Sequence, residues 1–175
     1  MRLKDRFSWG TRAYVMGILN ISPDSFSGDG LGSGDGLGDV EVAVAQARRF
    51  ADAGADLLDI GGESTRPDAR PVNAAVEISR IAPVIAAVRA VLPDMPISVD
   101  TSRAEVAAAA LDAGADIVND VWGLRADPDI AAVAAARGAA VILMHNRSKP
   151  GCAQIDARLG GEYIGAHYED LLGEV

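Results

Sequence analysis

The stretch ADAGADLLDIGGESTRP, residues 51–67, shows in miniature how this chain is built. An alanine-rich segment ends at Gly54, and glycine is the residue type that most often ends a helix in the left-handed conformation. The apolar run 56–61 follows and is typical of a buried parallel strand. Gly61 ends that run, and a polar loop with a second glycine, two hydroxyls and an arginine comes directly after it. The order is therefore helix end, strand, polar loop.

The same order recurs along the chain. Apolar runs predict five strands, and alanine-rich stretches predict helices between them. The strands are expected at 14–19, 56–61, 96–100, 116–119 and 140–144, and the helices at about 39–52, 74–91, 102–113, 128–137 and from near Gly161. Alternating units of this kind give a parallel sheet with right-handed crossovers. We expect one α/β domain, residues 1–175, folded as a TIM-type (β/α)8 barrel of which about five βα units are present.

Local signals predict how several elements begin. Residues 3–19 read as a small hairpin that leads into the first core strand. Asp39 is expected to cap the first helix, and Thr101 or Ser102 the third. The segment 22–38 is dense in glycine and is expected to be a mobile loop.

Two phrases of the form x-Asp-Ala-Gly-Ala-Asp occur at 51–56 and 111–116. Gene duplication would explain the likeness. A shared turn from helix to strand, with glycine in the left-handed conformation, explains it more simply, and we favour that interpretation.

Composition excludes several classes of protein. Apolar residues make up 49% of the chain, and the net charge of −9 argues against a protein that coats nucleic acid. Cys152 is the only cysteine, so no internal disulfide can form. One cysteine and two histidines are too few ligands for a zinc site of the usual types. No run of apolar residues is long enough to span a membrane, and residues 1–9 lack the features of a signal peptide. We expect a cytoplasmic protein.

Polar residues lie at or just past the end of each apolar run, at Asn20, Thr65, Asp100, Asn119 and Asn146. In a βα-barrel these positions converge on the face where barrel enzymes do their chemistry. An asparagine oxygen such as that of Asn20 suits Mg²⁺. Thr65 and Arg66, after two glycines, suit a phosphate. The Asp100 carboxylate and the Asn119 amide suit adjacent N–H groups on a pteridine or guanine edge.

Each of these residues also has a purely structural interpretation. Asn20 could cap the turn before Pro23, Arg66 could lie on the surface, and Asp100 could cap a helix or join a buried ion pair. Asp120 is expected to organise a strand end. His145 could act as a base, but a framework role is the more usual one, and Met144 could form an apolar wall or pack in the core.

The ordered set of segments resembles the dihydropteroate synthase family. The matching segments are 16–27, 59–67, 97–101, 117–123 and 141–146, and they span nearly the whole chain. The resemblance implies a (β/α)8 barrel that joins 4-aminobenzoate to (7,8-dihydropterin-6-yl)methyl diphosphate and releases 7,8-dihydropteroate and diphosphate. It also implies a sulfonamide target. No catalytic acid or base is assigned, because departure of diphosphate generates the electrophile.

By motif position the resemblance implies a role for individual residues. Asn20 would bind Mg²⁺, Asp100 and Asn119 would hold the pterin edge, Thr65 would contact the pterin diphosphate, and Arg66 would contact its leaving phosphates. The loops 22–26 and 64–67 would fold over the second substrate. Full-length members are expected to be homodimers.

The resemblance is incomplete, because the family's later segments have no counterpart among these 175 residues. They include an Asp-Pro-Gly strand end, a Ser-Arg-Lys segment and an Arg-x-His ending. A five-unit sheet is expected to leave apolar edges open and to self-associate. Two alternatives stay open: a corrinoid methyltransferase-like domain that uses methyltetrahydrofolate, and a non-catalytic half-barrel that binds a pterin or a partner.

Overall fold

The computed structural model describes residues 6–21, 37–63, 72–145, 155–156, 162–163 and 168–175. Five strands in these ranges form one parallel sheet, in the same order as in the chain. They are β1 Met16–Asn20, β2 Leu57–Gly61, β3 Ile97–Asp100, β4 Ile117–Asp120 and β5 Ala140–Leu143. Each of the five predicted strands is therefore confirmed.

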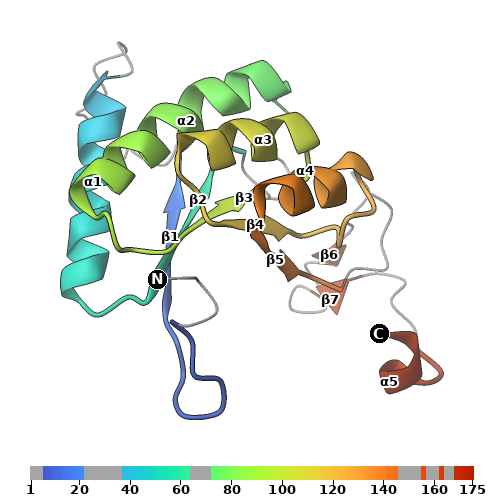
Figure 1. Cartoon of the computed structure of the whole chain (residues 1–175). Coiled ribbons are helices and arrows are strands. Elements are labelled where there is room, and N and C mark those ends of the chain that lie inside the picture. Colours follow the sequence, from blue (N-terminus) through green and yellow to red (C-terminus); the bar gives the residue numbers. More distant parts are fainter. Residues whose placement is uncertain (1–5, 22–36, 64–71, 146–154, 157–161, 164–167) are drawn as a thin grey trace.

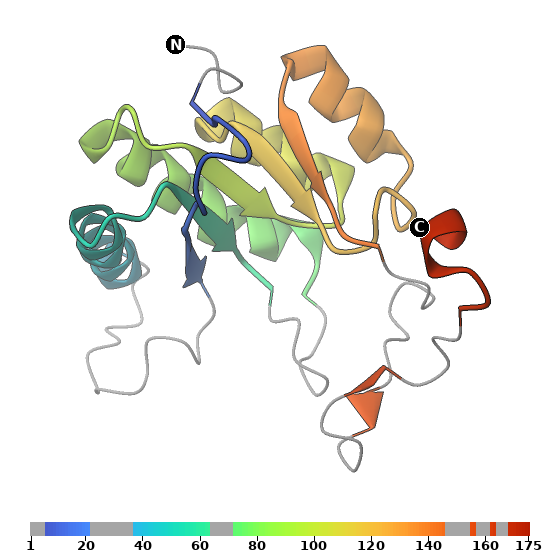
Figure 2. The ribbon, with the colours of Figure 1, turned by 90° about the horizontal axis from the view of Figure 1, so that it is seen from below.

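Helices connect these strands and lie on one face of the sheet (Figure 1). They are α1 Leu37–Asp52, α2 Ala74–Val91, α3 Ala104–Ala113 and α4 Asp129–Arg137. Seen from below, the strands lie in front of these helices, and no described helix covers their other face (Figure 2). No helix in the described ranges is both long and apolar enough to cross a membrane.

The strand order explains the fold class. A doubly wound sheet reverses its order at a switch point and carries helices on both faces. Here neighbouring strands are consecutive in the chain and the connecting helices stay on one side, which is how a TIM-type barrel is wound. The described ranges thus contain four βα units and the strand of a fifth, in line with the predicted barrel of which about five units are present.

The core lies between the sheet and the helices. One row of strand residues in register, Leu19, Ile60, Val99 and Val118, is almost completely buried. The apolar side chains of α2 that pack on the sheet include Ile81, Val84, Ile85 and Val88. Gly17 adds space on β1, because a Cβ there would lie 2.7 Å from Cδ2 of Phe50. Phe50 of α1 can therefore reach the first strand.

The two Asp-Ala-Gly-Ala-Asp phrases form the same helix-to-strand turn. Gly54 and Gly114 have φ angles of 92° and 116°, which favour glycine. The aspartate that ends each phrase then accepts a hydrogen bond from the neighbouring strand: Asp56 from the Val15 N–H, and Asp116 from the Ile97 N–H, both at 2.9 Å. The simpler interpretation of the repeat is therefore confirmed.

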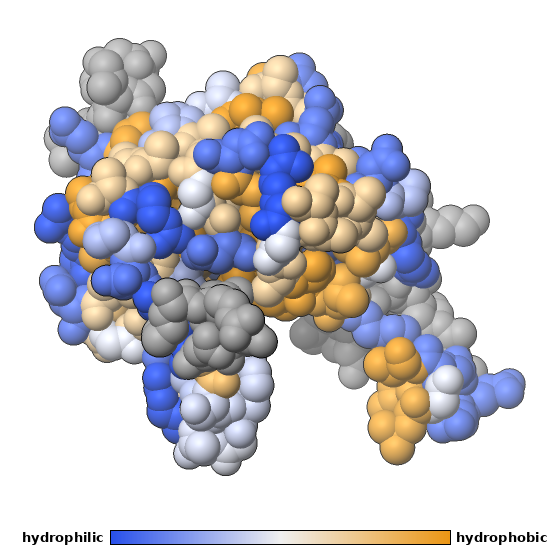
Figure 3. Space-filling model, in the orientation of Figure 1, coloured by the Kyte–Doolittle hydropathy of each residue, from blue (hydrophilic) through white to orange (hydrophobic). Residues whose placement is uncertain are grey.

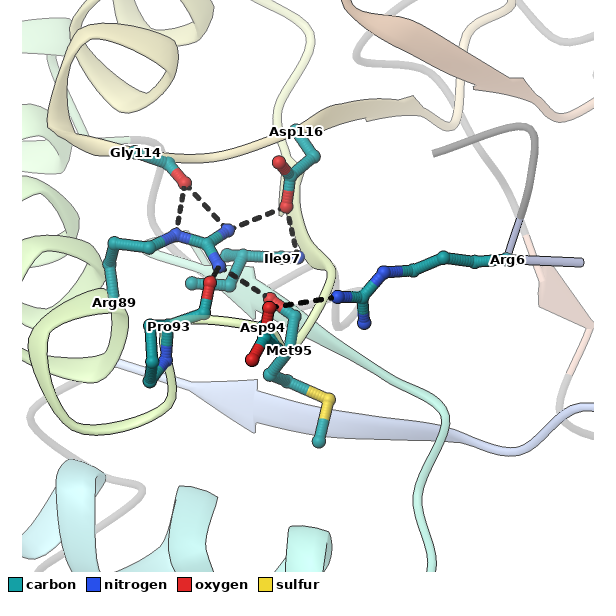
Figure 4. Close-up of polar contacts among 8 residues, drawn as sticks. All are labelled: Arg6, Arg89, Pro93, Asp94, Met95, Ile97, Gly114 and Asp116. Atoms are coloured by element: carbon teal, nitrogen blue, oxygen red, sulfur yellow. Dashed lines mark hydrogen bonds and ion pairs between the residues drawn. The ribbon is translucent and has the colours of Figure 1, made fainter. Parts of the chain in front are cut away.

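An arginine completes each of these turns. Arg12 pairs with Asp56 through both carboxylate oxygens. Arg89 of α2 donates to Asp116 at 2.6 Å and to the carbonyl oxygens of Pro93, Met95 and Gly114 (Figure 4). These contacts fasten α2 to the amino ends of β3 and β4. That end of a barrel serves stability, whereas the opposite end carries the chemistry.

The predicted helix caps are wrong in two places. Helix α1 begins at Leu37, so Asp39 lies within its first turn instead of capping it. Helix α3 begins at Ala104 with Arg103 as N-cap, and neither Thr101 nor Ser102 caps it. Instead the Ala104 N–H donates to Oδ2 of Asp127 at 2.8 Å. The cap comes from the next βα unit, which a local sequence pattern does not show.

Two further predictions fail near the ends of the chain. Residues 6–15 form no strand, since Ser8 donates its N–H to the Tyr14 hydroxyl and Phe7, Trp9 and Tyr14 pack as an aromatic cluster. Gly161 lies outside the described residues, and the two described residues that follow it are not part of the predicted helix. Glu162–Tyr163 forms the short strand β7, which pairs with β6 Ile155–Asp156, and α5 spans Leu171–Glu174. Glycines and a β-preferring Tyr-Ile pair around residue 162 disfavour a helix.

Candidate functional site

Four of the strand-end positions lie in one row. Parallel pairing aligns Asn20 of β1 with Gly61 of β2, Gly61 with Asp100 of β3, and Asp100 with Asn119 of β4. All four lie at the carboxyl end of the sheet. The structure therefore brings together three of the residues that the sequence singled out, and adds Gly61 between two of them.

Gly61 leaves space at the centre of this row. A Cβ on Gly61 would lie 3.6 Å from Oδ2 of Asp100 and 3.9 Å from Oδ1 of Asn20. Both oxygens thus border the space above the glycine, and a larger side chain at position 61 would enter it. The gap suits a ligand that approaches the backbone closely.

Asp100 is the residue of the row whose pKa is shifted. Burial, followed by the charges of nearby carboxylates, raises its pKa to about 7. Those carboxylates are, in decreasing order of effect, Asp59, Glu77, Asp120 and Glu63. Within the described part of the chain, no side chain makes a hydrogen bond or ion pair with Asp100, and Arg103 is the N-cap of α3. Neither structural alternative for Asp100 is thus seen there. Its oxygens are available to an N–H donor from a ligand.

The Asn119 side chain is held by a hydrogen bond to Asp59. Its Nδ2 atom donates a hydrogen bond to Oδ2 of Asp59, 3.1 Å away. Asp59 is 3% exposed, and burial raises its pKa, opposed by the Ser98 hydroxyl and by the Asn119 amide. The Ser98 hydroxyl lies close enough to affect the carboxylate, although its geometry falls short of a hydrogen bond. The sequence did not single out Asp59. Its signal was a carboxylate inside an otherwise apolar strand.

Asp120 has a structural role, as the sequence suggested. It is fully buried, and its two oxygens accept the N–H groups of Trp122 and Leu124 at 2.9 and 2.6 Å. These bonds close the turn after β4, in which Gly123 and Leu124 have positive φ angles. The neighbouring Asn119 is therefore the residue of this pair that faces the candidate site.

A charged network supports the end of β2. Arg103 donates to Glu63 at 2.6 Å and also contacts Glu77, which is 1% exposed on α2. Arg80 donates to the Gly62 carbonyl oxygen at 2.9 Å. Sequence reasoning missed this network. Glu77 lies on the apolar face that contains Ile81, and a carboxylate there needs a partner.

The remaining candidates contribute less to the described site. Thr65, Arg66 and Asn146 lie outside the described residues, as do Cys152 and the loop 22–36. His145 is exposed, with its ring 5.7 Å from that of Tyr168. Met144 is 38% exposed and is therefore not a core residue.

The donor set at the row fits a hard cation only in part. Among the described residues, no group of three or more His, Cys, Asp or Glu side chains could hold a metal ion. Asn20 provides one exposed carboxamide oxygen that borders the space above Gly61. Mg²⁺ commonly takes one or two protein ligands and completes its shell with substrate phosphates and water. The single oxygen of Asn20 is therefore chemically compatible with Mg²⁺ but does not form a metal site without further ligands.

The amino-acid sequence is similar to those of known proteins. A dihydropteroate synthase of Synechocystis is 47% identical over 169 residues, which cover 97% of this chain and 53% of that protein. The dihydropteroate synthase of Bacillus subtilis is 49% identical over 80% of this chain and 47% of its own length. The chain thus spans about half the length of these relatives.

The fold is also similar to solved structures of dihydropteroate synthases. The dihydropteroate synthase of Xanthomonas albilineans with 4-aminobenzoic acid is 43% identical, with a TM-score of 0.73 over 94% of this chain and 52% of that one. The same enzyme with 7,8-dihydropteroate has a TM-score of 0.69 over 94% of this chain and 51% of that one. The family model described as "Pterin binding enzyme" matches residues 16–164. This chain therefore belongs to the pterin-binding enzyme family.

Proposed function

We propose that this chain belongs to a dihydropteroate synthase, which condenses 4-aminobenzoate with (7,8-dihydropterin-6-yl)methyl diphosphate to give 7,8-dihydropteroate and diphosphate. The observation that carries the proposal is the row Asn20, Gly61, Asp100 and Asn119, which combines an oxygen ligand, an open backbone and a hydrogen-bonding edge. The names of the relatives support the same activity.

Asp100 and Asn119 would hold the pterin edge. The ionised Asp100 carboxylate accepts hydrogen bonds only, whereas the Asn119 carboxamide can accept and donate. A dihydropterin presents ring N–H and amino groups side by side, so the two residues match it in chemistry, and they lie in register on adjacent strands. Binding would fix the orientation of the methylene carbon that reacts.

The reaction replaces one bond to that methylene carbon. The C–O bond to diphosphate breaks, and its electron pair leaves with the diphosphate. The amine nitrogen of 4-aminobenzoate then forms a C–N bond with the same carbon and loses a proton to solvent. A strong general base is not required, because positioning and charge stabilisation lower the barrier.

The leaving group needs positive charge and donors. Thr65 and Arg66 are the candidates for these contacts by motif position, with an hydroxyl and a guanidinium suited to phosphate oxygens. The network of Arg103 with Glu63 and Glu77 fixes the end of β2 from which that segment departs. Mg²⁺, held by Asn20 together with the substrate, would neutralise charge that develops on the diphosphate.

The names of the relatives favour this activity over the two alternatives. No relative named above is a corrinoid methyltransferase. A half-barrel that only binds pterin would explain the row but would give no turnover. Small-molecule substrates follow from the proposal, and homodimerisation of the full-length protein is part of it.

A coupled assay tests the proposal. The full-length natural protein should form 7,8-dihydropteroate from the two substrates, release one diphosphate per product, and be inhibited by a sulfonamide that competes with 4-aminobenzoate. Asp100→Ala should abolish pterin binding measured by calorimetry, while the far-ultraviolet circular dichroism spectrum, which reports the secondary structure, is unchanged. Binding of methyltetrahydrofolate without diphosphate release would support the methyltransferase, and pterin binding without turnover would support the non-catalytic domain.

A further inference from the structure

Asp59 makes a contact that skips a strand. It belongs to β2 and Asn119 belongs to β4, with β3 between them. Their side chains nevertheless meet, at 3.1 Å between Nδ2 of Asn119 and Oδ2 of Asp59. Ser98 is the β3 residue in register with Asp59, and its small side chain lets the contact pass. Because Asp59 and Gly61 are two residues apart, Asp59 lies on the same face of the sheet as the site.

The fold alone does not account for a carboxylate at position 59. Asp59 is 3% exposed, and its second oxygen, Oδ1, has no hydrogen-bond partner among the residues that the structure describes. Burying a carboxylate with incomplete hydrogen bonding is unfavourable, and an apolar residue would avoid that penalty. The partner that Asp59 does have is a residue of the candidate site.

An amide needs such a partner if its orientation is to be unique. The oxygen and nitrogen of a carboxamide have nearly the same shape but opposite hydrogen-bonding character. If the Asn119 amide turned over, its oxygen would face the Asp59 oxygen, and two acceptors would lie in contact. The Asp59 carboxylate therefore excludes the flipped amide.

We propose that Asp59 is a positioning residue that fixes the Asn119 carboxamide and thereby selects which heterocycle edge the site accepts. The inference rests on the proposed function, since it assumes that Asn119 faces a pterin. With one N–H engaged by Asp59, the amide presents its oxygen and its second N–H in fixed places beside Asp100. A ring that presents an amino group fits this pattern, and a ring with a carbonyl at the same place does not.

The experiment compares two ligands in the full-length natural protein. The probes are 6-hydroxymethyl-7,8-dihydropterin and the corresponding lumazine, in which a carbonyl replaces the 2-amino group. Wild-type protein should prefer the pterin. Asp59→Asn keeps the shape but can donate as well as accept, so both amide orientations become possible. We define the selectivity as the dissociation constant of the lumazine divided by that of the pterin. This ratio should fall by about tenfold in Asp59→Asn, through loss of a hydrogen bond to a charged group.

Ser98→Ala is the matched control. It removes a buried oxygen beside Asp59 but leaves the contact with Asn119, so the ratio should stay within about twofold of wild type. If Asp59→Asn folds poorly, Asp59→Ser tests the same contact with a smaller side chain, because a serine at position 59 is too short to reach the amide.

The outcomes separate the two proposals. A lower ratio in the Asp59 variants, with Ser98→Ala unchanged, supports the positioning role. An unchanged ratio in folded Asp59 variants overturns it while the proposed function stands. If wild-type protein binds neither ligand, the proposed function and this inference both fail. Equal losses for both ligands would show a structural role for Asp59 and would also overturn the inference.

Discussion

Asp100 combines two properties that oppose each other. Among the described residues no side-chain donor pairs with its oxygens, and burial, followed by the charges of nearby carboxylates, raises its pKa to about 7. A ligand that donates two N–H groups would relieve the second property by using the first. If Asp100 holds the pterin as proposed, binding and ionisation of this residue are therefore linked.

This linkage predicts how stability depends on pH. The folded pKa of Asp100 lies above the ordinary value of 3.8, so the native state binds more protons than the unfolded state between about pH 4 and 7. The contribution of Asp100 to stability is thus fully present below pH 4 and is lost as pH rises towards 7, by on the order of 4 kcal/mol. Asp100→Asn should remove this loss and be more stable than wild type at pH 8.

Urea unfolding at pH 5 and pH 8 measures the effect. Asp94→Asn is the control, because the Asp94 side chain is 95% exposed and contacts only Arg6 among the described residues. It should retain the wild-type loss between the two pH values. The same loss in Asp100→Asn would mean that other groups cause it.

Asn20 carries the prediction about the metal ion. If it holds Mg²⁺ together with a diphosphate, Asn20→Ala should weaken Mg²⁺-dependent diphosphate binding by at least about tenfold. Asn20→Asp, which retains an oxygen ligand, should recover most of the affinity. Calorimetry measures the diphosphate affinity with and without a chelator. If the wild-type affinity for diphosphate does not change with chelator, Asn20 does not bind Mg²⁺ as predicted.

At this scale the sequence predicted which polar residues lie at strand ends, but not the partners of their side chains. Asn20, Asp100 and Asn119 could be identified because each follows an apolar run, and parallel strands bring such positions together. Asp59 and Arg103 could not be identified in this way. The contact of Asp59 joins β2 with β4, and those of Arg103 join the start of α3 with α2 and with Glu63 after β2. Such distant pairings depend on the three-dimensional arrangement.

Between elements, the network around Arg103 is the strongest candidate for stabilising the site. Its guanidinium bridges Glu63 at the end of β2 and the buried Glu77 of α2. Removing one partner of a buried ion pair leaves the other charge without compensation. Arg103→Leu should therefore reduce the free energy of unfolding by about 2–4 kcal/mol.

A second substitution tests the cause of this loss. Glu77→Gln in the Arg103→Leu background removes the uncompensated charge and should restore part of the stability, as measured by urea unfolding of both variants. A loss of stability below about 0.5 kcal/mol in Arg103→Leu, or no recovery in the double variant, would show that the ion pairs do not stabilise the packing of β2, α2 and α3.

Element boundaries were predictable where the signal is local. Gly54 and Gly114 end their helices because each adopts a left-handed conformation that glycine favours. The cap of α3 was not predictable, since Asp127 of the following βα unit provides it. The predicted hairpin failed for a similar reason: an aromatic cluster, not strand pairing, organises Phe7, Trp9 and Tyr14.

At the scale of the whole molecule, the sheet has two outer strands. Exposed apolar side chains on and beside them include Val15 and Ile18 at β1, and Val141, Ile142, Leu143 and Met144 at β5. In the space-filling view, apolar surface is visible over β5 beneath α4, and also on α5 (Figure 3). A regular alternation of strands and helices allowed the sheet order to be predicted. The exposure of its edges followed from the number of units.

Edge exposure predicts that the purified 175-residue chain self-associates. An outer strand presents unpaired N–H and C=O groups to another chain, and apolar side chains beside it strengthen the pairing. Leu143 of β5 is 57% exposed, and a lysine there would oppose pairing at this edge. We therefore expect light scattering to show an average mass that rises with concentration in the wild type and rises less in Leu143→Lys. Leu172→Lys is the control, because Leu172 of α5 is more exposed, at 91%, but is not part of the sheet. An equal reduction in both variants would show that general surface hydrophobicity, and not the edge of the sheet, drives the association.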